Sequence, residues 1–224
     1  MSIKKLVFIF LTVINFNVLH AQSNNDTQLW LGISAKKKFN HGFLSKFQYR
    51  TRIIEDITRL RGSFLYFTLE KKLSKSFNVE TNYRLALIEN LVYHRYSLGF
   101  EIEEKVGKSK LSLRPLVQYQ RLANAIDIET SQQARSFFRP RLTWETDLTK
   151  KVEIYAYVEP FYKIYNNFNI NWWQNSLGLK YEVYQKLKLN PFFIWQPGTT
   201  KKNSNNNLKP LQKKDSVQVG CGWY

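Results

Sequence analysis

Apolar and polar residues alternate along most of the chain after Gln28. The clearest example is 77–87, whose odd positions are apolar or aromatic except for Thr81 and whose even positions are mostly polar or charged. A period of two is typical of a β-strand with one apolar and one polar face. Such segments recur about eleven times, each close to the roughly 9–11 residues of a tilted membrane strand.

The segments between these strands also alternate, in length. Short basic turns are expected at 36–42, 71–76 and 146–151, and longer links at 54–60, 123–134, 164–171 and 197–214. Short turns at one end and long loops at the other are typical of membrane barrels. The pattern therefore predicts an all-β fold, an antiparallel up-and-down transmembrane β-barrel of about 10–12 strands.

Two features conflict with a regular barrel. Proline cannot donate to a strand ladder, yet prolines fall inside the expected strands, at Pro115, Pro140, Pro160 and Pro191. A count near eleven also conflicts with the even strand number of bacterial single-chain barrels.

Alternation alone does not separate a membrane barrel from a soluble lipocalin-like binding barrel, whose apolar face is turned inward. Aromatic residues at the strand ends favour the membrane, because they form girdles at the two interfaces of a bilayer. The expected interface aromatics are Trp30, Trp144, Trp172, Trp173, Trp195, Trp223 and Tyr224. The terminal Tyr224 on an amphipathic last strand resembles the signal by which barrel assembly machinery recognises outer-membrane proteins.

The N-terminus predicts export. Lys4 and Lys5 precede an apolar run that ends at Leu19-His20-Ala21, which is the pattern of a secretory signal peptide. We expect cleavage after Ala21, so that 1–21 is the signal and 22–224 the barrel, in the outer membrane of a Gram-negative bacterium. The single cysteine, Cys221, excludes a disulfide within the chain.

The formal net charge is +17, and the predicted signal contributes only two of the basic residues. A basic chain usually has an acidic partner. Since export makes nucleic acid an improbable partner, we expect outer-membrane lipids and lipopolysaccharide instead.

Four short elements carry a family resemblance, at Gln28-Leu29-Trp30-Leu31-Gly32, 47–52, Asn82-Tyr83-Arg84 and Tyr93-His94-Arg95-Tyr96. They resemble the uncharacterised DUF2490 family, whose members resemble outer-membrane barrels. The resemblance covers most of the chain after the signal. It implies the fold and the location but no activity.

Charged residues are concentrated on the polar face of the predicted strands, which would line the lumen. The candidate set is Arg50, Arg52, Arg84, Arg95, Arg114, Arg139, Arg141, Glu80, Glu101, Glu153 and Glu159. Arginine and carboxylate groups can crosslink and fill a narrow barrel. Alternatively, an excess of arginine over acid would make a narrow, anion-preferring pore.

A lipid-modifying enzyme of the outer membrane is a third class of function. After the signal the chain has only His41 and His94 as histidines, and Ser97 lies on the opposite strand face from His94. No metal-binding, phosphate-binding or nucleotide-binding motif is present. The sequence therefore predicts neither an enzyme nor a cofactor.

Overall fold

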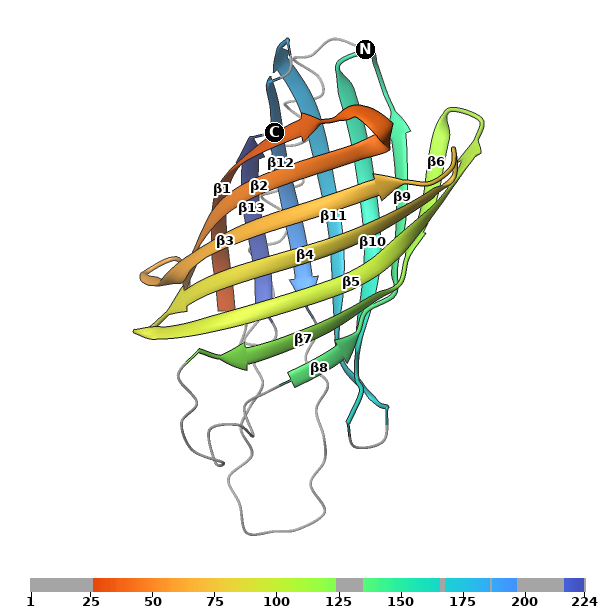
Figure 1. The fold of residues 1–224 in the computed structure, drawn as a ribbon. Helices are drawn as coiled ribbons and strands as arrows, with labels where there is room; N and C mark the ends of the chain where they lie inside the picture. The colour runs from red at the N-terminus through yellow and green to blue at the C-terminus, as the bar shows by residue number, and fades with distance from the viewer. Residues whose placement is uncertain (1–25, 124–134, 166–167, 186, 197–215, 224) are drawn as a thin grey trace.

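The fold is a single β-sheet, seen in a computed structural model that describes residues 26–123, 135–165, 168–185, 187–196 and, for the backbone alone, 216–223. Figure 1 shows the strands wrapping around a common axis. Within the described residues the strands are β1 (Asp26–Lys38), β2 (Phe43–Ile54), β3 (Arg59–Lys72), β4 (Phe77–Ile88), β5 (Leu91–Val106), β6 (Ser109–Arg114), β7 (Leu116–Leu122), β8 (Arg135–Phe138), β9 (Arg141–Asp147), β10 (Val152–Lys163), β11 (Ile170–Tyr184), β12 (Leu187–Gln196) and β13 (Ser216–Trp223). No helix among these residues is long and apolar enough to cross a lipid bilayer.

Hydrogen-bonded pairings lead around the sheet and return to the first strand. They run from β1 to β5, then through β6 and β7 to β9 and β8, and on through β10, β11 and β12 to β13. β13 pairs antiparallel with β12 and parallel with β1, from Asp26 opposite Ser216 to Ile33 opposite Trp223. All other pairings are antiparallel, which confirms the predicted all-β barrel architecture.

Two of the predicted strands are interrupted at prolines. β6 and β7 both pair with β5 in one continuous register on either side of Pro115. β9 and β8 pair in the same way with β10, on either side of Pro140. If β6 with β7 and β8 with β9 are each counted as one strand, the thirteen strands make eleven, which is within the predicted range of 10–12.

The two ends of the barrel differ in their connections. Residues 39–42, 73–76, 107–108 and 148–151 join strands at one end, which we call the short-turn end. The opposite end receives the connections 55–58, 89–90, 123–134, 164–169 and 197–215. Two connections at this end are short as well. The predicted longer link at 54–60 is wrong, because β2 extends to Ile54 and β3 begins at Arg59, which leaves the four-residue turn 55–58. In the turn Glu89-Asn90 both residues have a positive φ, as a type I′ hairpin turn requires.

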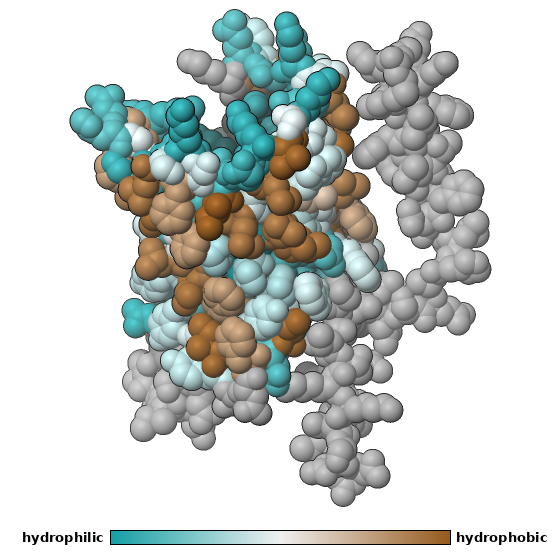
Figure 2. Space-filling model, turned by 90° about the vertical axis from the view of Figure 1, so that its right-hand side faces the viewer, coloured by the Kyte–Doolittle hydropathy of each residue, from teal (hydrophilic) through white to brown (hydrophobic). Residues whose placement is uncertain are grey.

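Apolar side chains cover the outside of the barrel, and polar side chains lie inside. Ile33, Leu98 and Leu177 are exposed by 61%, 62% and 59%, whereas Gln118 and Glu159 are buried. Figure 2 shows an apolar zone on the side of the molecule below a hydrophilic rim. This distribution is the reverse of a lipocalin-like barrel, in which the apolar face would be turned inward.

Candidate functional site: the charged lumen

The barrel encloses a cavity of about 680 Å³ to which nearly every strand contributes side chains. Because successive residues of a strand point to opposite faces, each two-faced strand directs its polar set into this space. Of the lining residues, ten are basic and four are acidic. The basic ones are Lys46, Arg50, Arg52, Arg61, Arg84, Arg95, Arg114, Arg139, Arg141 and Lys180, and the acidic ones Glu70, Glu80, Glu101 and Glu145.

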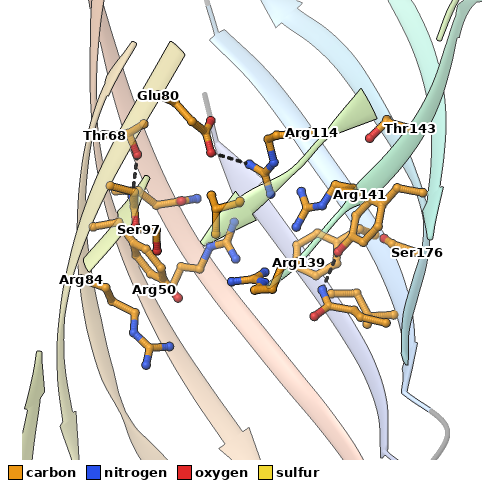
Figure 3. A pocket seen from close by; sticks show the side chains of 18 of the residues that line it. Arg50, Thr68, Glu80, Arg84, Ser97, Arg114, Arg139, Arg141, Thr143 and Ser176 are labelled. Atoms are coloured by element: carbon orange, nitrogen blue, oxygen red, sulfur yellow. Dashed lines mark hydrogen bonds and ion pairs between the residues drawn. The ribbon is translucent and has the colours of Figure 1, made fainter. Parts of the chain in front are cut away.

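Glu159 of β10 is the centre of one charged cluster in the wall of the cavity. Its carboxylate is 0% exposed and accepts from Arg139 Nη2 at 2.9 Å and Arg141 Nη2 at 2.8 Å. Arg114 lies 3.5 Å from the second carboxylate oxygen and also donates to Glu80, at 3.2 Å. Figure 3 shows Arg114, Arg139 and Arg141 on the same side of the cavity. These three arginines are thus held by carboxylates.

Aromatic faces support the same cluster. The guanidinium of Arg139 lies 4.3 Å from the centre of the Phe161 ring, and that of Arg141 lies 4.1 Å from the Tyr157 ring. Cation–π contacts of this kind are stronger where water is excluded. The cluster therefore has a fixed geometry, with three arginines sharing the carboxylates of Glu159 and Glu80.

A second network of alternating charges connects β6, β9, β10 and β11. Lys110 Nζ lies 2.7 Å from Glu145, and Lys180 Nζ lies 3.0 Å from Glu145 and 2.6 Å from Glu153. Each of these lysines has a carboxylate on a neighbouring strand. This part of the wall is therefore crosslinked and close to neutral.

The wall formed by β2, β4 and β5 is different, because amide oxygens and aromatic rings are the partners of its arginines. Arg84 donates to Gln120 Oε1 at 2.7 Å. The side-chain amide oxygen of Gln48, when it is turned towards Arg50, accepts hydrogen bonds from Nε and Nη2 of Arg50 at 3.0 and 3.1 Å. Amide oxygens satisfy hydrogen bonds but do not neutralise charge, so within the described chain Arg50, Arg84 and Arg95 have no carboxylate in contact, although Glu80 and Glu101 lie elsewhere on the same strands.

Two aromatics predicted for the membrane interface lie inside instead. Trp30 and Trp172 both line the cavity: Trp30 lies under Arg52 at 4.9 Å, and Trp172 stacks on Phe161 at 4.5 Å between ring centres. Both predictions were wrong. Adjacent strand residues face opposite sides, so Trp172 and Trp173 cannot share a face, and Trp30 faces inward because its neighbour Leu31 faces outward.

Other predicted interface aromatics are on the outside. Trp144 and Trp195 are exposed by 41% and 47%, and Trp173 is outside the set of lining residues. The side chain of Trp223 and all of Tyr224 lie beyond the described part of the chain.

The predicted lumen set comes together in the structure. Its seven arginines and Glu80 and Glu101 line the cavity, while Glu159 lies beneath three of the arginines and Glu153 binds Lys180. The prediction missed the inner aromatics, including Tyr66, Tyr155 and Phe192. The alternation could have revealed these aromatics, because each is separated from inward polar or charged residues of its own strand by an even number of positions and so shares their face.

Neither of the two histidines in the described residues lines the cavity. His94 Nδ1 is hydrogen-bonded to the hydroxyl of Tyr83 at 2.7 Å, beside the outward-facing Tyr96, and His41 is exposed in a turn. Among the described residues, no group of three or more His, Cys, Asp or Glu side chains is placed to hold a metal ion.

The profile of the DUF2490 family, described as a protein of unknown function, matches residues 27–207. The chain belongs to the DUF2490 family. This confirms the resemblance noted from its short motifs. Curated protein sequences gave no match.

Solved structures similar to this DUF2490 protein include two porins. The NanC porin superposes with a TM-score of 0.51 at 8% identity, over 76% of this chain and 86% of that one. An anion-selective porin from Comamonas acidovorans gives a TM-score of 0.40 at 12% identity, over 84% of this chain and 53% of that one. The first likeness shows that the DUF2490 chain has a porin-type β-barrel fold.

Proposed function

We propose that this protein is an outer-membrane barrel with a narrow, anion-preferring passage. The observation that carries the proposal is the lining of the cavity, where basic side chains outnumber acidic ones by ten to four. Field lines are concentrated in a lumen with low-dielectric walls, so an excess of one sign raises the local concentration of the opposite ion. A barrel of about eleven strands leaves little free space, which favours small ions over large solutes.

The outer surface supports the membrane location. Large apolar side chains are exposed on nearly every strand, and an aqueous environment would oppose an apolar surface of that extent. By the usual asymmetry of such barrels, the short-turn end would face the periplasm. Signal cleavage after Ala21 and recognition of the last strand by the assembly machinery belong to this proposal. Residues 1–21 lie outside the described chain.

Planar bilayer recordings with purified, detergent-folded protein test the passage. In a gradient of potassium chloride we expect small discrete currents whose reversal potential lies towards the chloride equilibrium potential. Folding is checked first by the shift in gel mobility on heating. Channels that favour potassium would contradict the anion preference.

Persistent silence from folded protein would instead favour a structural barrel. The Glu159 cluster and the Lys110–Glu145–Lys180–Glu153 network would then crosslink a closed interior. A matched variant sharpens the experiment: Arg50→Glu should move the reversal potential towards potassium, whereas Arg59→Gln, at the exposed start of β3, should leave it unchanged.

A further inference from the structure

Three guanidinium groups lie close to one tyrosine on the wall formed by β2 to β5. Tyr66 of β3 is directly opposite Arg84 of β4, which is itself opposite Arg95 of β5. The guanidinium carbons of Arg50 and Arg95 lie 5.4 and 5.7 Å from the centre of the Tyr66 ring. Arg84 packs over the neighbouring Phe64 ring at 5.4 Å. All except Phe64 line the cavity, and Figure 3 shows Arg50 and Arg84 among the side chains that surround it.

These arginines lack the carboxylates that bind the arginines across the cavity. Among the described residues, no carboxylate lies within 4.0 Å of Arg50, Arg84 or Arg95. The Nε atoms of Arg84 and Arg95 are buried and have no hydrogen-bond partner in the described part of the chain, as is also true of Arg114, Arg139 and Arg141, so the missing carboxylate is what sets this wall apart. Burying like charges close together is costly unless an opposite charge is supplied. An anion from solution would supply it.

The number and kind of donors indicate which anion fits. A guanidinium presents a planar fork of N–H groups that matches two oxygens of an oxyanion. A carboxylate has two oxygens in one plane and satisfies one fork well, whereas a tetrahedral phosphate can accept from several forks on different sides. The Tyr66 hydroxyl adds a neutral donor. Three positive charges also favour a doubly charged ligand over a singly charged one.

We propose that Arg50, Tyr66, Arg84 and Arg95 form a binding site for a compact, doubly charged phosphate, either inorganic phosphate or the terminal phosphate of a small phosphomonoester. The site deepens the proposed anion passage by naming its preferred class of solute. Arg114, Arg139 and Arg141 do not form an equivalent site, because Glu159 and Glu80 already supply negative charge in contact with them.

Binding is measured on the detergent-folded full chain by calorimetric titration at constant ionic strength, with no current required. The titrants are inorganic phosphate and glycerol phosphate, with acetate and chloride as singly charged comparators. We expect both phosphates to bind at least about tenfold more tightly than acetate. Tighter binding of glycerol phosphate than of inorganic phosphate would identify the phosphomonoester as the better ligand.

Variants then locate the site. Arg95→Gln removes one positively charged guanidinium, which can donate two parallel hydrogen bonds, and should weaken phosphate binding about tenfold or more. Tyr66→Phe should weaken it by a smaller factor, and Arg59→Gln should leave it unchanged, since Arg59 binds Glu55 and Glu89 in exposed turns. If Arg95→Gln does not fold, Arg95→Lys keeps the charge without the fork and should still lose affinity.

Phosphate that binds wild-type protein no more tightly than acetate would overturn the proposal, and this result needs no variant. Phosphate binding that survives in both Arg95→Gln and Arg84→Gln would overturn it as well, because the anion would then lie elsewhere. The two proposals fail separately. Phosphate binding without current contradicts the passage but supports the site, whereas an anion-selective current without phosphate preference contradicts the site alone.

Discussion

Glu159 shows how strongly a single carboxylate can be tied to its surroundings in this lumen. It is fully enclosed and contacts Arg139, Arg141 and Arg114. Replacing it with glutamine would leave three buried cations with only Glu80 nearby, and breaking a buried ion pair from one side costs about 3–5 kcal/mol. We therefore expect Glu159→Gln to lower the free energy of unfolding by about 3 kcal/mol, measured by urea unfolding in lipid vesicles with tryptophan fluorescence.

Glu89→Gln is the matched control. Glu89 pairs with Arg59, and both side chains are about half exposed, so its loss should cost less than about 1 kcal/mol. Equal effects of the two substitutions would show that the Glu159 cluster does not stabilise the barrel.

The side to which each residue points was largely readable from the sequence, and the exceptions share a cause. Alternation placed all seven candidate arginines correctly on the inner face. Trp30 and Trp172 were misplaced because their residue type was weighed above their position in the strand. Trp30 alternates with Leu31, which is exposed on the outside, so the pattern already predicted an inward tryptophan. The partners of each arginine were not predictable, because they depend on register between distant strands.

Three of the four in-strand prolines that conflicted with the predicted barrel lie on one row across neighbouring strands. The register of β6–β9 and β7–β8, continued across the gap, places Pro115 opposite Pro140. The register of β9–β10 and β8–β10 likewise places Pro140 opposite Pro160. Arg139 and Leu116 donate a backbone hydrogen bond to each other, so the polar backbone groups of Arg139 point towards β7. Because these groups alternate in direction along a strand, those of Pro140 point the other way, towards β10. Neither Pro140 nor Pro160 can donate there, and the ladder is open at that point.

This gap predicts local opening between β8/β9 and β10. In hydrogen–deuterium exchange of the folded protein, the amides of 136–142 and 158–163 should exchange faster than those of β3 and β4, whose pairing from Gly62 to Lys72 is unbroken. Pro140→Val restores one donor and should slow the exchange of 158–163 without affecting β3 and β4. Equal protection of both regions in the native protein would contradict the prediction.

The fold of the whole molecule followed from the repeated two-faced strands, but the way in which the sheet meets itself did not. An odd number of crossings brings the first and last strands together in parallel, as β1 and β13 are paired. Periodicity gives the number and faces of strands, whereas this pairing depends on where 216–223 lies after a long connection. The same limit explains the proline problem, since the sequence could not place three distant prolines on one row.

Charge is distributed unevenly between the two ends of the molecule. Exposed lysines surround the short-turn end, at Lys37, Lys38, Lys72, Lys75, Lys108, Lys150 and Lys151. At the opposite end, the turns 55–58 and 89–90 carry three acidic residues, Glu55, Asp56 and Glu89. We call the exposed lysines of the short-turn end the lysine rim. In the proposed membrane location the lysine rim would lie next to the apolar zone of the wall, at the depth of lipid head groups, where each lysine near an anionic surface contributes about 1 kcal/mol.

We therefore expect the short-turn end to retain anionic phospholipids. The triple variant Lys75→Gln, Lys108→Gln, Lys151→Gln should reduce bound phosphatidylglycerol at least about fivefold relative to phosphatidylcholine, measured by native mass spectrometry from mixed-lipid nanodiscs. The corresponding Lys→Arg triple keeps the charge and should retain the lipid. Retention should also fall as salt rises, since exposed charges are screened over about 10 Å at 0.1 M salt. If the glutamine triple retains phosphatidylglycerol as well as the arginine triple, the lysine rim is a solvated surface without lipid preference.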